Sequence, residues 1–313
     1  MFASIDIGTN TVLLLIAEYV GDKLTVIHVD QRIPRLGKGV DENRNLSDRS
    51  IQRVINALKE YRRLIDHYYP QVEQTIVTAT SAVRDSANQE QFLKQVKQKT
   101  GFDVRILSGE EEAEWTYLGA RSMMPPDADL ADQLITLDIG GGSTEVSLGR
   151  NDELIDFHSF DIGSVRFTER FIHSDPPKQE EIQACRKAIK TAFEDRLFSW
   201  EGEAQAIGVA GTVTSLAFME AGLVTYDPQE LAGMKMTKKQ VSEWIKELSQ
   251  MTTAELLKEH PVVMEGRADV FLPGILILEV FLSTYNFDDF LVSTGGVRHG
   301  AILKLYQQKK GAG

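Results

Sequence analysis

One short motif occurs twice in this chain of 313 residues, each time directly after an apolar, strand-like run. Its two copies are Ile5-Asp6-Ile7-Gly8-Thr9-Asn10-Thr11 and Leu137-Asp138-Ile139-Gly140-Gly141-Gly142-Ser143. An apolar strand carries an aspartate to its tip, where a carboxylate can hold a metal ion. The Gly, Ser and Thr residues that follow leave backbone N–H groups uncovered, so a phosphate can approach. The pair predicts a duplicated phosphate-binding fold, although two unrelated hairpins with Gly-rich turns would explain either copy alone.

The two halves keep the same register beyond the motif. When Asp6 is aligned with Asp138, segment 12–18 falls on 144–150, and a looser correspondence joins 75–81 with 206–212. Periodicity and caps predict helices from Ser47 to Pro70 and over 86–99, 163–172, 177–198, 213–221, 237–250 and 267–285, the last kinked or split at Pro273-Gly274. Strands are expected between them. This alternation is typical of an α/β fold with mixed sheets covered by helices.

The length suffices for two domains with separate cores. We expect the first domain over residues 1–124 and the second over 125–297, with a hinge at Pro125-Pro126-Asp127. A C-terminal helix over about 298–313 follows Gly295-Gly296. These boundaries leave it available to pack back onto the first domain.

Charge and composition exclude several classes of function. A net charge of −12 argues against general nucleic-acid binding, because such proteins usually carry a basic face. No apolar run is long enough to cross a bilayer, and the first residues lead straight into a strand without a signal peptide. We therefore expect a cytoplasmic protein with no membrane attachment. The six histidines show no zinc-ligand spacing, so any metal should be held by oxygen. The single cysteine, Cys185, lies on an apolar helical stripe and is predicted to be a buried structural thiol.

A polyanionic substrate would be repelled by so acidic a chain unless positive charge were concentrated locally. The candidates for that charge are Arg32, Arg35, Lys38, Arg84, Arg166, Arg267 and Arg298. Each of them could equally be a solvated surface residue.

Ordered motifs along essentially the whole chain resemble those of the exopolyphosphatase/guanosine pentaphosphate phosphatase (Ppx/GppA) family. They are Asp6–Thr11, Thr80-Ser81-Ala82-Val83-Arg84-Asp85, Ser108-Gly109-Glu110-Glu111-Glu112-Ala113, Asp138–Glu145, Gly211-Thr212, Gly266-Arg267-Ala268-Asp269 and Ser293-Thr294-Gly295-Gly296-Val297-Arg298. The family more often has Ser at the positions of Thr9 and Thr11. The resemblance implies two duplicated ribonuclease-H-like domains of the actin-like ATPase superfamily, facing each other across a cleft into which Asp6 and Asp138 point. Longer members carry a further helical domain, so the short two-domain form is expected here.

Three consecutive glutamates follow Ser108. Glu111 is explained as the capping-box partner of Ser108, and Glu110 as a solvated residue in the first turn of a helix. Neither of these structural roles accounts for Glu112. The resemblance implies that Glu112 is the general base, which would orient a water molecule and take its proton. From the residues alone, all three could be surface charge.

Asp138 and Glu145 are separated by three glycines and a Ser-Thr pair. If the chain turns back at the glycines, both carboxylates lie at the same end of the strand pair. Such oxygen ligands suit Mg²⁺. An outward-facing strand residue is the alternative for Glu145, and Asp6 could bind metal or only support its loop. Arg84 is the second catalytic candidate, because a guanidinium can bind a phosphate bidentately. Its alternative is a salt bridge to Asp85.

The phosphate-binding candidates are backbone or side-chain donors in the two loops and in a third segment. They are Gly8, Thr9, Asn10, Thr11, Gly140, Gly141, Gly142, Ser143, Thr144, Gly211 and Thr212. As loop residues they could instead satisfy their own turns. Arg267 and Arg298 are candidates for substrate contact, with an ion pair between domains equally open for Arg267.

The resemblance implies hydrolysis of terminal phosphoanhydride bonds with Mg²⁺ as cofactor, releasing orthophosphate from inorganic polyphosphate, from guanosine pentaphosphate, or from both. Phosphoryl transfer is mostly positioning and charge compensation. This reaction therefore needs no more than the two Gly-rich loops, the metal ion, one arginine and one base. Two alternatives are an ATP-dependent small-molecule kinase of the same superfamily, with an adenosine pocket at Gly295-Gly296, and a non-catalytic alarmone or nucleotide sensor. The sequence does not choose between the substrates, and it leaves the oligomeric state, including a homodimer, open.

Overall fold

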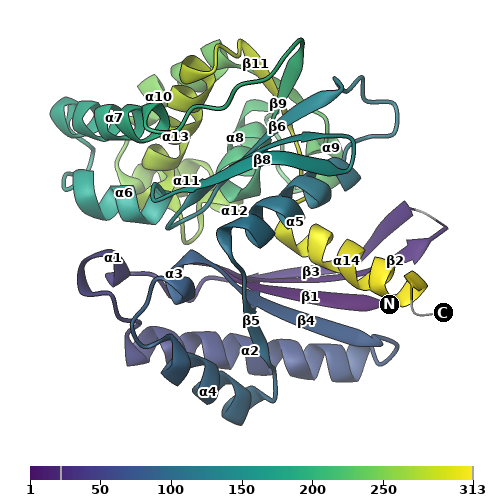
Figure 1. The fold of residues 1–313 in the computed structure, drawn as a ribbon. Helices are drawn as coiled ribbons and strands as arrows, with labels where there is room; N and C mark the ends of the chain where they lie inside the picture. The colour runs from purple at the N-terminus through teal and green to yellow at the C-terminus, as the bar shows by residue number, and fades with distance from the viewer. Residues whose placement is uncertain (22, 312–313) are drawn as a thin grey trace. The chain divides into compact units, whose positions relative to one another are not determined.

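The computed structural model describes residues 1–21 and 23–311, which form two compact units. Unit 1 comprises Met1–Ser122 together with the C-terminal segment that begins at Val297, and unit 2 comprises Met123–Gly296. Each unit is built on a β-sheet with helices packed against it (Figure 1). The α/β class predicted from the alternation of strand and helix patterns is therefore confirmed.

The sheet of unit 1 has five strands among the described residues, in the order β3-β2-β1-β4-β5. Their bounds are β1 (Phe2–Ile7), β2 (Val12–Val20), β3 (Lys23–Arg32), β4 (Gln74–Ala79) and β5 (Val104–Ile106). Strand β2 is antiparallel to β1 and β3, whereas β4 is parallel to both β1 and β5. Ile7 pairs with Ala79, so the loops that follow β1 and β4 leave the sheet at the same edge. That edge carries the first set of candidate residues.

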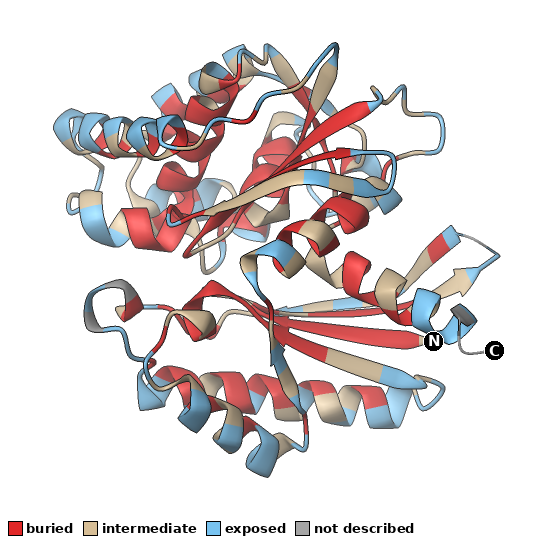
Figure 2. Ribbon diagram, viewed as in Figure 1, coloured by how far each residue is buried: buried red, intermediate tan, exposed pale blue. Residues whose placement is uncertain are grey.

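Helices cover both faces of this sheet (Figure 1). Helices α2 (Asp48–Tyr68) and α4 (Gln89–Thr100) bury their apolar stripes against Ile5, Ile7 and their neighbours, as the buried segments in Figure 2 show. Helices α5 (Gly109–Ser122) and α14 (Val297–Gly311) pack against each other and cover the other face. Side chains alternate across a strand, so Asp6 lies on the face opposite to Ile5 and Ile7. It therefore points to the side on which α5 begins.

The sheet of unit 2 repeats this arrangement with one additional strand. Its order is β10-β11-β9-β6-β7-β8 among the described residues. The bounds are β6 (Gln133–Ile139), β7 (Thr144–Arg150), β8 (Glu153–Phe160), β9 (Ala204–Val209), β10 (Lys235–Thr237) and β11 (Asp289–Val292). Read from β8, the first five strands have the same order and directions as those of unit 1. This is the duplicated ribonuclease-H-like architecture that the motifs imply.

The duplication extends to details of the loops. The Gly8 N–H donates to the Thr11 carbonyl at 2.9 Å, and the Gly140 N–H donates to the Ser143 carbonyl at 3.0 Å. Both outer strand pairs also contain a register shift at matching positions, between Ile16 and Ala17 and between Leu148 and Gly149. Two unrelated hairpins would not share a turn and a bulge at the same offset. The prediction that the two motifs belong to a duplicated fold is therefore confirmed.

The core of unit 2 is organised around one long apolar helix. Helix α13 (Phe271–Thr284) contacts α6 (Ser164–Phe171), α7 (Gln179–Glu194), α8 (Ala210–Glu220) and α10 (Lys238–Leu248). The predicted kink or split at Pro273-Gly274 is wrong, because α13 begins only at Phe271. Pro273 therefore lies in the first turn, where a proline interrupts no backbone hydrogen bond. Cys185 of α7 is fully buried in this core, as predicted.

Several short elements connect the main ones. They are α1 (Val40–Asn43), α3 (Ser81–Arg84), α9 (Pro228–Leu231), α11 (Thr253–Glu259), α12 (Pro261–Met264) and the 3₁₀ turn η1 (Ala268–Val270). The sequence analysis missed the short α-helices and β10, because segments this short carry no usable periodicity, whereas η1 lies within the helix predicted over 267–285. The predicted N-cap at Ser47 and the capping box of Thr237 with Gln240 are both present. None of the helices in the described parts of the chain is long and apolar enough to cross a membrane.

Candidate active site

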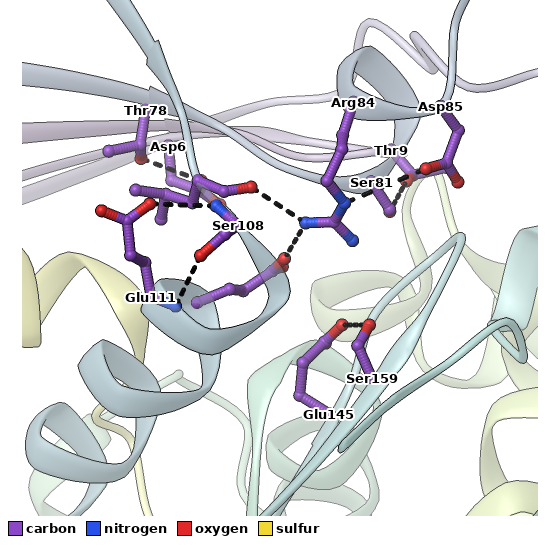
Figure 3. A network of polar contacts seen from close by, with 12 residues as sticks. Asp6, Thr9, Thr78, Ser81, Arg84, Asp85, Ser108, Glu111, Glu145 and Ser159 are labelled. Carbon is purple, nitrogen blue, oxygen red and sulfur yellow. Dashed lines mark hydrogen bonds and ion pairs between the residues drawn. The ribbon is translucent and has the colours of Figure 1, made fainter. Parts of the chain in front are cut away.

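The first motif forms a tight loop between β1 and β2, and a second loop braces it. The Gly37 N–H donates to the Thr9 carbonyl at 2.8 Å, and the Arg35 N–H donates to the Asn10 carbonyl at 3.0 Å. A Cβ at position 37 would lie 2.2 Å from Cγ2 of Thr9, so any larger residue there would have to displace the Thr9 side chain. Oγ of Thr9 is 3.2 Å from Oγ of Ser81 (Figure 3). The segment after β3 and the start of α3 thus hold the Gly8–Thr11 loop in place.

Asp6 is buried at the end of β1, directly below this loop. Thr78, its neighbour on β4, donates from Oγ1 to Oδ1 of Asp6 at 3.2 Å (Figure 3). A buried carboxylate needs partners of this kind, because desolvation penalises its charged form. The contact gives Asp6 a structural role in its own sheet. Whether it also binds metal stays a prediction.

Arg84 and Glu112, the two catalytic candidates, are in contact within unit 1. Arg84 is the last residue of α3, and its Nη1 donates to Oε2 of Glu112 at 2.8 Å and to the Leu107 carbonyl at 3.1 Å (Figure 3). Glu112 lies in the first turn of α5 and is only 7% exposed. The alternative partner, Asp85, is 3.9 Å from Nε of Arg84. Of these two carboxylates, Glu112 therefore makes the shorter ion pair with Arg84.

The other two glutamates of the triplet have separate roles. Ser108 and Glu111 form the predicted capping box: the Ser108 N–H donates to Oε2 of Glu111 at 3.0 Å, and the Glu111 N–H donates to Oγ of Ser108 at 3.1 Å (Figure 3). Burial raises the pKa of Glu111, but bonds from Ser108 and Arg105 outweigh it and hold the pKa below its usual value. Glu110 is exposed, as expected. Glu112 is left as the buried carboxylate of the three.

The second motif forms the corresponding loop in unit 2, and helix α6 binds its carbonyl groups. The N–H groups of Ser164 and Val165 donate to Gly140 and Gly141 at 2.9 Å each, and Nε of the buried Arg166 donates to Gly142 at 2.6 Å. Among the described residues, no hydrogen bond reaches the N–H groups of Gly141 and Gly142. With carbonyls on the α6 side, these N–H groups are available to an anion such as phosphate.

Asp138 and Glu145 face each other directly across the β6–β7 pair. Residues opposite each other in an antiparallel pair share one face of the sheet, with Cβ atoms about 5 Å apart. The expected return of the chain at Gly140–Gly142 is therefore present. Oγ of Ser159 on β8 donates to Oε1 of Glu145 at 2.7 Å (Figure 3), and Glu145 is 2% exposed.

This donor set fits a magnesium ion. No group of three or more His, Cys, Asp or Glu side chains lies close enough to enclose a metal in the described part of the chain. Mg²⁺ does not require such a group, because it usually takes one or two carboxylates and completes its shell with water and phosphate oxygens. Two carboxylates on one face, with no imidazole or thiolate grouped with them among the residues that the structure describes, are ligands of that kind.

The third segment, at the start of α8, is held by Arg267. Nη1 of Arg267 donates to the Gly211 carbonyl at 2.8 Å and to Oγ of Ser215 at 3.0 Å. A Cβ on Gly211 would lie 2.3 Å from that nitrogen, and a Cβ on Gly274 would lie 2.7 Å from Oγ1 of Thr212. Burial lowers the pKa of Arg267. The residue before Gly211, Ala210, has a φ of 66°, a strained conformation for alanine and one that clusters at functional sites.

Two candidates have contacts that account for them structurally. Arg298 on α14 donates from Nη1 to the Leu14 carbonyl in the middle of β2 at 3.0 Å. Thr144 is fully buried and donates to the Ile162 carbonyl at 2.7 Å. Their predicted contacts with substrate stay predictions.

The sequence analysis missed the residues that brace the loops. Gly163 lies so close to the second loop that a Cβ would meet backbone atoms of Gly141 at 2.5 Å. Arg166 was weighed only as a source of charge. A signal did exist: Asp161-Ile162-Gly163-Ser164 repeats the Asp-Ile-Gly pattern of the two motifs for a third time, directly after β8.

Known proteins resemble this chain over almost all of its length. It is 33% identical to exopolyphosphatase 2 of Mycobacterium tuberculosis strain H37Rv, covering 97% of this chain and 98% of that protein. It is 32% identical to the bifunctional 3-dehydroquinate synthase/phosphatase of Fusobacterium nucleatum, covering 98% of this chain but only 47% of that relative. The chain therefore spans about half the length of the bifunctional protein.

Solved structures agree with these sequence relatives. The crystal structure of the Aquifex aeolicus member of the Ppx/GppA protein family superposes with a TM-score of 0.82 at 32% identity, covering 98% of both chains. An exopolyphosphatase from Cytophaga hutchinsonii gives a TM-score of 0.87 at 26% identity, again covering 98% of both chains. The sequence of this chain also matches the Ppx/GppA phosphatase family over residues 15–309. The chain therefore belongs to the Ppx/GppA phosphatase family.

Proposed function

We propose that this protein hydrolyses terminal phosphoanhydride bonds and releases orthophosphate from inorganic polyphosphate, from guanosine pentaphosphate, or from both. Membership of a phosphatase family and the similarity to exopolyphosphatase 2 support this proposal. The observation that carries it is the buried Glu112 carboxylate in contact with the Arg84 guanidinium. A base for water and a cation for the phosphoryl group are what hydrolysis needs beyond binding.

Phosphate binding is assigned to backbone N–H groups and hydroxyls of the loops. The Gly141 and Gly142 N–H groups suit this role because α6 binds the carbonyls of their loop. Thr9 and Thr212 would add hydroxyl donors at the other two segments. That these segments grip one phosphate chain stays a prediction.

Asp138 and Glu145 would hold the Mg²⁺, which when bound offsets the negative charge of the phosphate oxygens. Ser159 would keep the Glu145 carboxylate in one orientation through its bond to Oε1. Asp6, with its Thr78 partner, is a supporting residue of the first loop in this scheme.

The chemical step follows from the remaining residues. Glu112 accepts a proton from water while the water oxygen forms a bond to the terminal phosphorus. The bond from that phosphorus to the bridging oxygen breaks, and the electron pair leaves with the shortened chain. Arg84 offsets charge on the transferring group. The products are orthophosphate and a chain one phosphate shorter.

The deciding experiment measures orthophosphate release from purified polyphosphate and guanosine pentaphosphate side by side, with Mg²⁺ and with excess chelator. We expect release from at least one substrate with Mg²⁺ alone, without an acceptor molecule. A requirement for an acceptor would instead indicate the kinase. No release from either substrate would contradict the proposal.

A further inference from the structure

Arg84 is attached to Glu112 and to the backbone from which the Glu112 helix starts. Nη1 carries two hydrogens, and the structure directs one to the Leu107 carbonyl and the other to Oε2 of Glu112. Leu107 directly precedes Ser108, the N-cap of α5. One guanidinium nitrogen therefore links the backbone at the start of the helix to a side chain in its first turn.

This arrangement restricts the Glu112 carboxylate. A glutamate side chain has three rotatable bonds, and fixing them costs rotamer entropy. The contact at 2.8 Å between Nη1 of Arg84 and Oε2 of the buried Glu112 fixes the position of Oε2 before substrate binds. A misplacement of about 1 Å in such a group can cost on the order of 10²-fold in rate.

We propose that Arg84 acts as a positioning residue for Glu112, in addition to any contact it makes with phosphate. This inference rests on the proposed function, in which Glu112 is the base. It differs from a role in phosphate binding alone in one measurable respect. If Arg84 also works through Glu112, its removal costs clearly less in rate once Glu112 can no longer accept a proton.

A double-mutant cycle separates the two roles. The variants are Arg84→Ala, Glu112→Gln and the double variant, each compared with wild type by steady-state orthophosphate release over a range of substrate concentrations. We expect Arg84→Ala to lower kcat by about 10²-fold, and by only about 10-fold or less when Glu112→Gln is already present, because only its direct contact with the phosphoryl group is then lost. Arg84→Lys should recover only part of the loss, because an ammonium is a point charge and cannot reproduce the rigid fork of the guanidinium.

The control is the neighbouring ion pair, in which Arg105 of β5 contacts Glu111 of α5. Arg105 pairs with Glu111 as Arg84 pairs with Glu112, but it is exposed and assigned to no chemical role. Arg105→Ala should therefore leave kcat within about 2-fold of wild type, and its effect should simply multiply with that of Glu112→Gln. Thermal unfolding of each variant confirms that it is folded, and Arg84→Lys serves in the cycle if Arg84→Ala is not.

Each outcome decides the inference. Coupled losses in kcat, with KM changed by less than about 3-fold, support positioning. Losses that multiply, or that appear in KM alone, mean that Arg84 acts only on the substrate and overturn it. If wild type releases no orthophosphate from either substrate, the proposed function fails instead, so the two failures are distinguishable.

Discussion

Gly163 offers a test of how the second loop is held, independent of any assumption about catalysis. Its φ of −156° is open to every residue, so only space requires glycine here. An added Cβ would meet the Gly141 carbonyl carbon and oxygen at 2.5 Å and the Gly142 carbonyl carbon at 2.6 Å. These are backbone atoms and cannot rotate away. Gly163→Ala must therefore shift either the loop or the start of α6.

The size of the effect follows from this contact. Overpacking a tight site costs about 1 to 3 kcal/mol, and we expect the upper end because both sides of the contact are backbone. The lower entropy of the unfolded alanine chain offsets about 0.4 to 1 kcal/mol of it. The net loss of about 2 kcal/mol corresponds to a fall in Tm of about 4 to 8 °C for a unit the size of residues 123–296.

The assay is thermal unfolding followed by circular dichroism, with Gly296→Ala as the matched control. Nothing lies within 4 Å of a Cβ at position 296, and its φ is not in the left-handed region. Gly296→Ala should leave the Tm unchanged or raise it slightly. Equal Tm values for Gly163→Ala and wild type would refute the close approach of α6 to the loop.

Three further predictions concern the site and the pH dependence of folding. Glu112→Gln should lower orthophosphate release by about 10² to 10⁴-fold while leaving the protein folded, whereas Glu111→Gln should cost little because Gln also serves in a capping box; comparable losses would disprove the assignment of the base. Asp138→Asn or Glu145→Gln should raise the Mg²⁺ concentration needed for activity, and full activity in excess chelator would rule out the metal site. Burial lowers the pKa of His299 to about 3. The folded protein therefore favours neutral His299. Because the folded pKa lies below the unfolded value, the contribution of His299 to the free energy of unfolding is complete above about pH 6.5 and is lost as pH falls. Chemical denaturation should show that the free energy of unfolding of the wild type falls by about 2 kcal/mol between about pH 7.5 and pH 5, and that His299→Asn removes this fall. The same dependence of the free energy on pH in both proteins would contradict the prediction.

The features that the sequence predicted are those with a local signal. The duplicated loops, the Ser108–Glu111 capping box and the facing positions of Asp138 and Glu145 all depend on residues within about one turn or one hairpin of each other. The contact between Arg84 and Glu112 joins residues 28 apart, and no spacing rule indicates it. The role of Gly163 depends on a close approach of two backbones, and its only trace in the sequence is a glycine within the third Asp-Ile-Gly pattern. The Pro273 error arose because the boundary of α13 was placed four residues too early.

Cys185 gives this protein a built-in reporter of opening in unit 2. It is the single cysteine of the chain and is fully buried in the core around α13. Burial also raises the pKa of its thiol to about 12, so almost no thiolate exists at neutral pH. A thiol reagent can therefore label the native chain only when α7 detaches from that core. The labelling rate measures how often this occurs, without any probe having to be introduced.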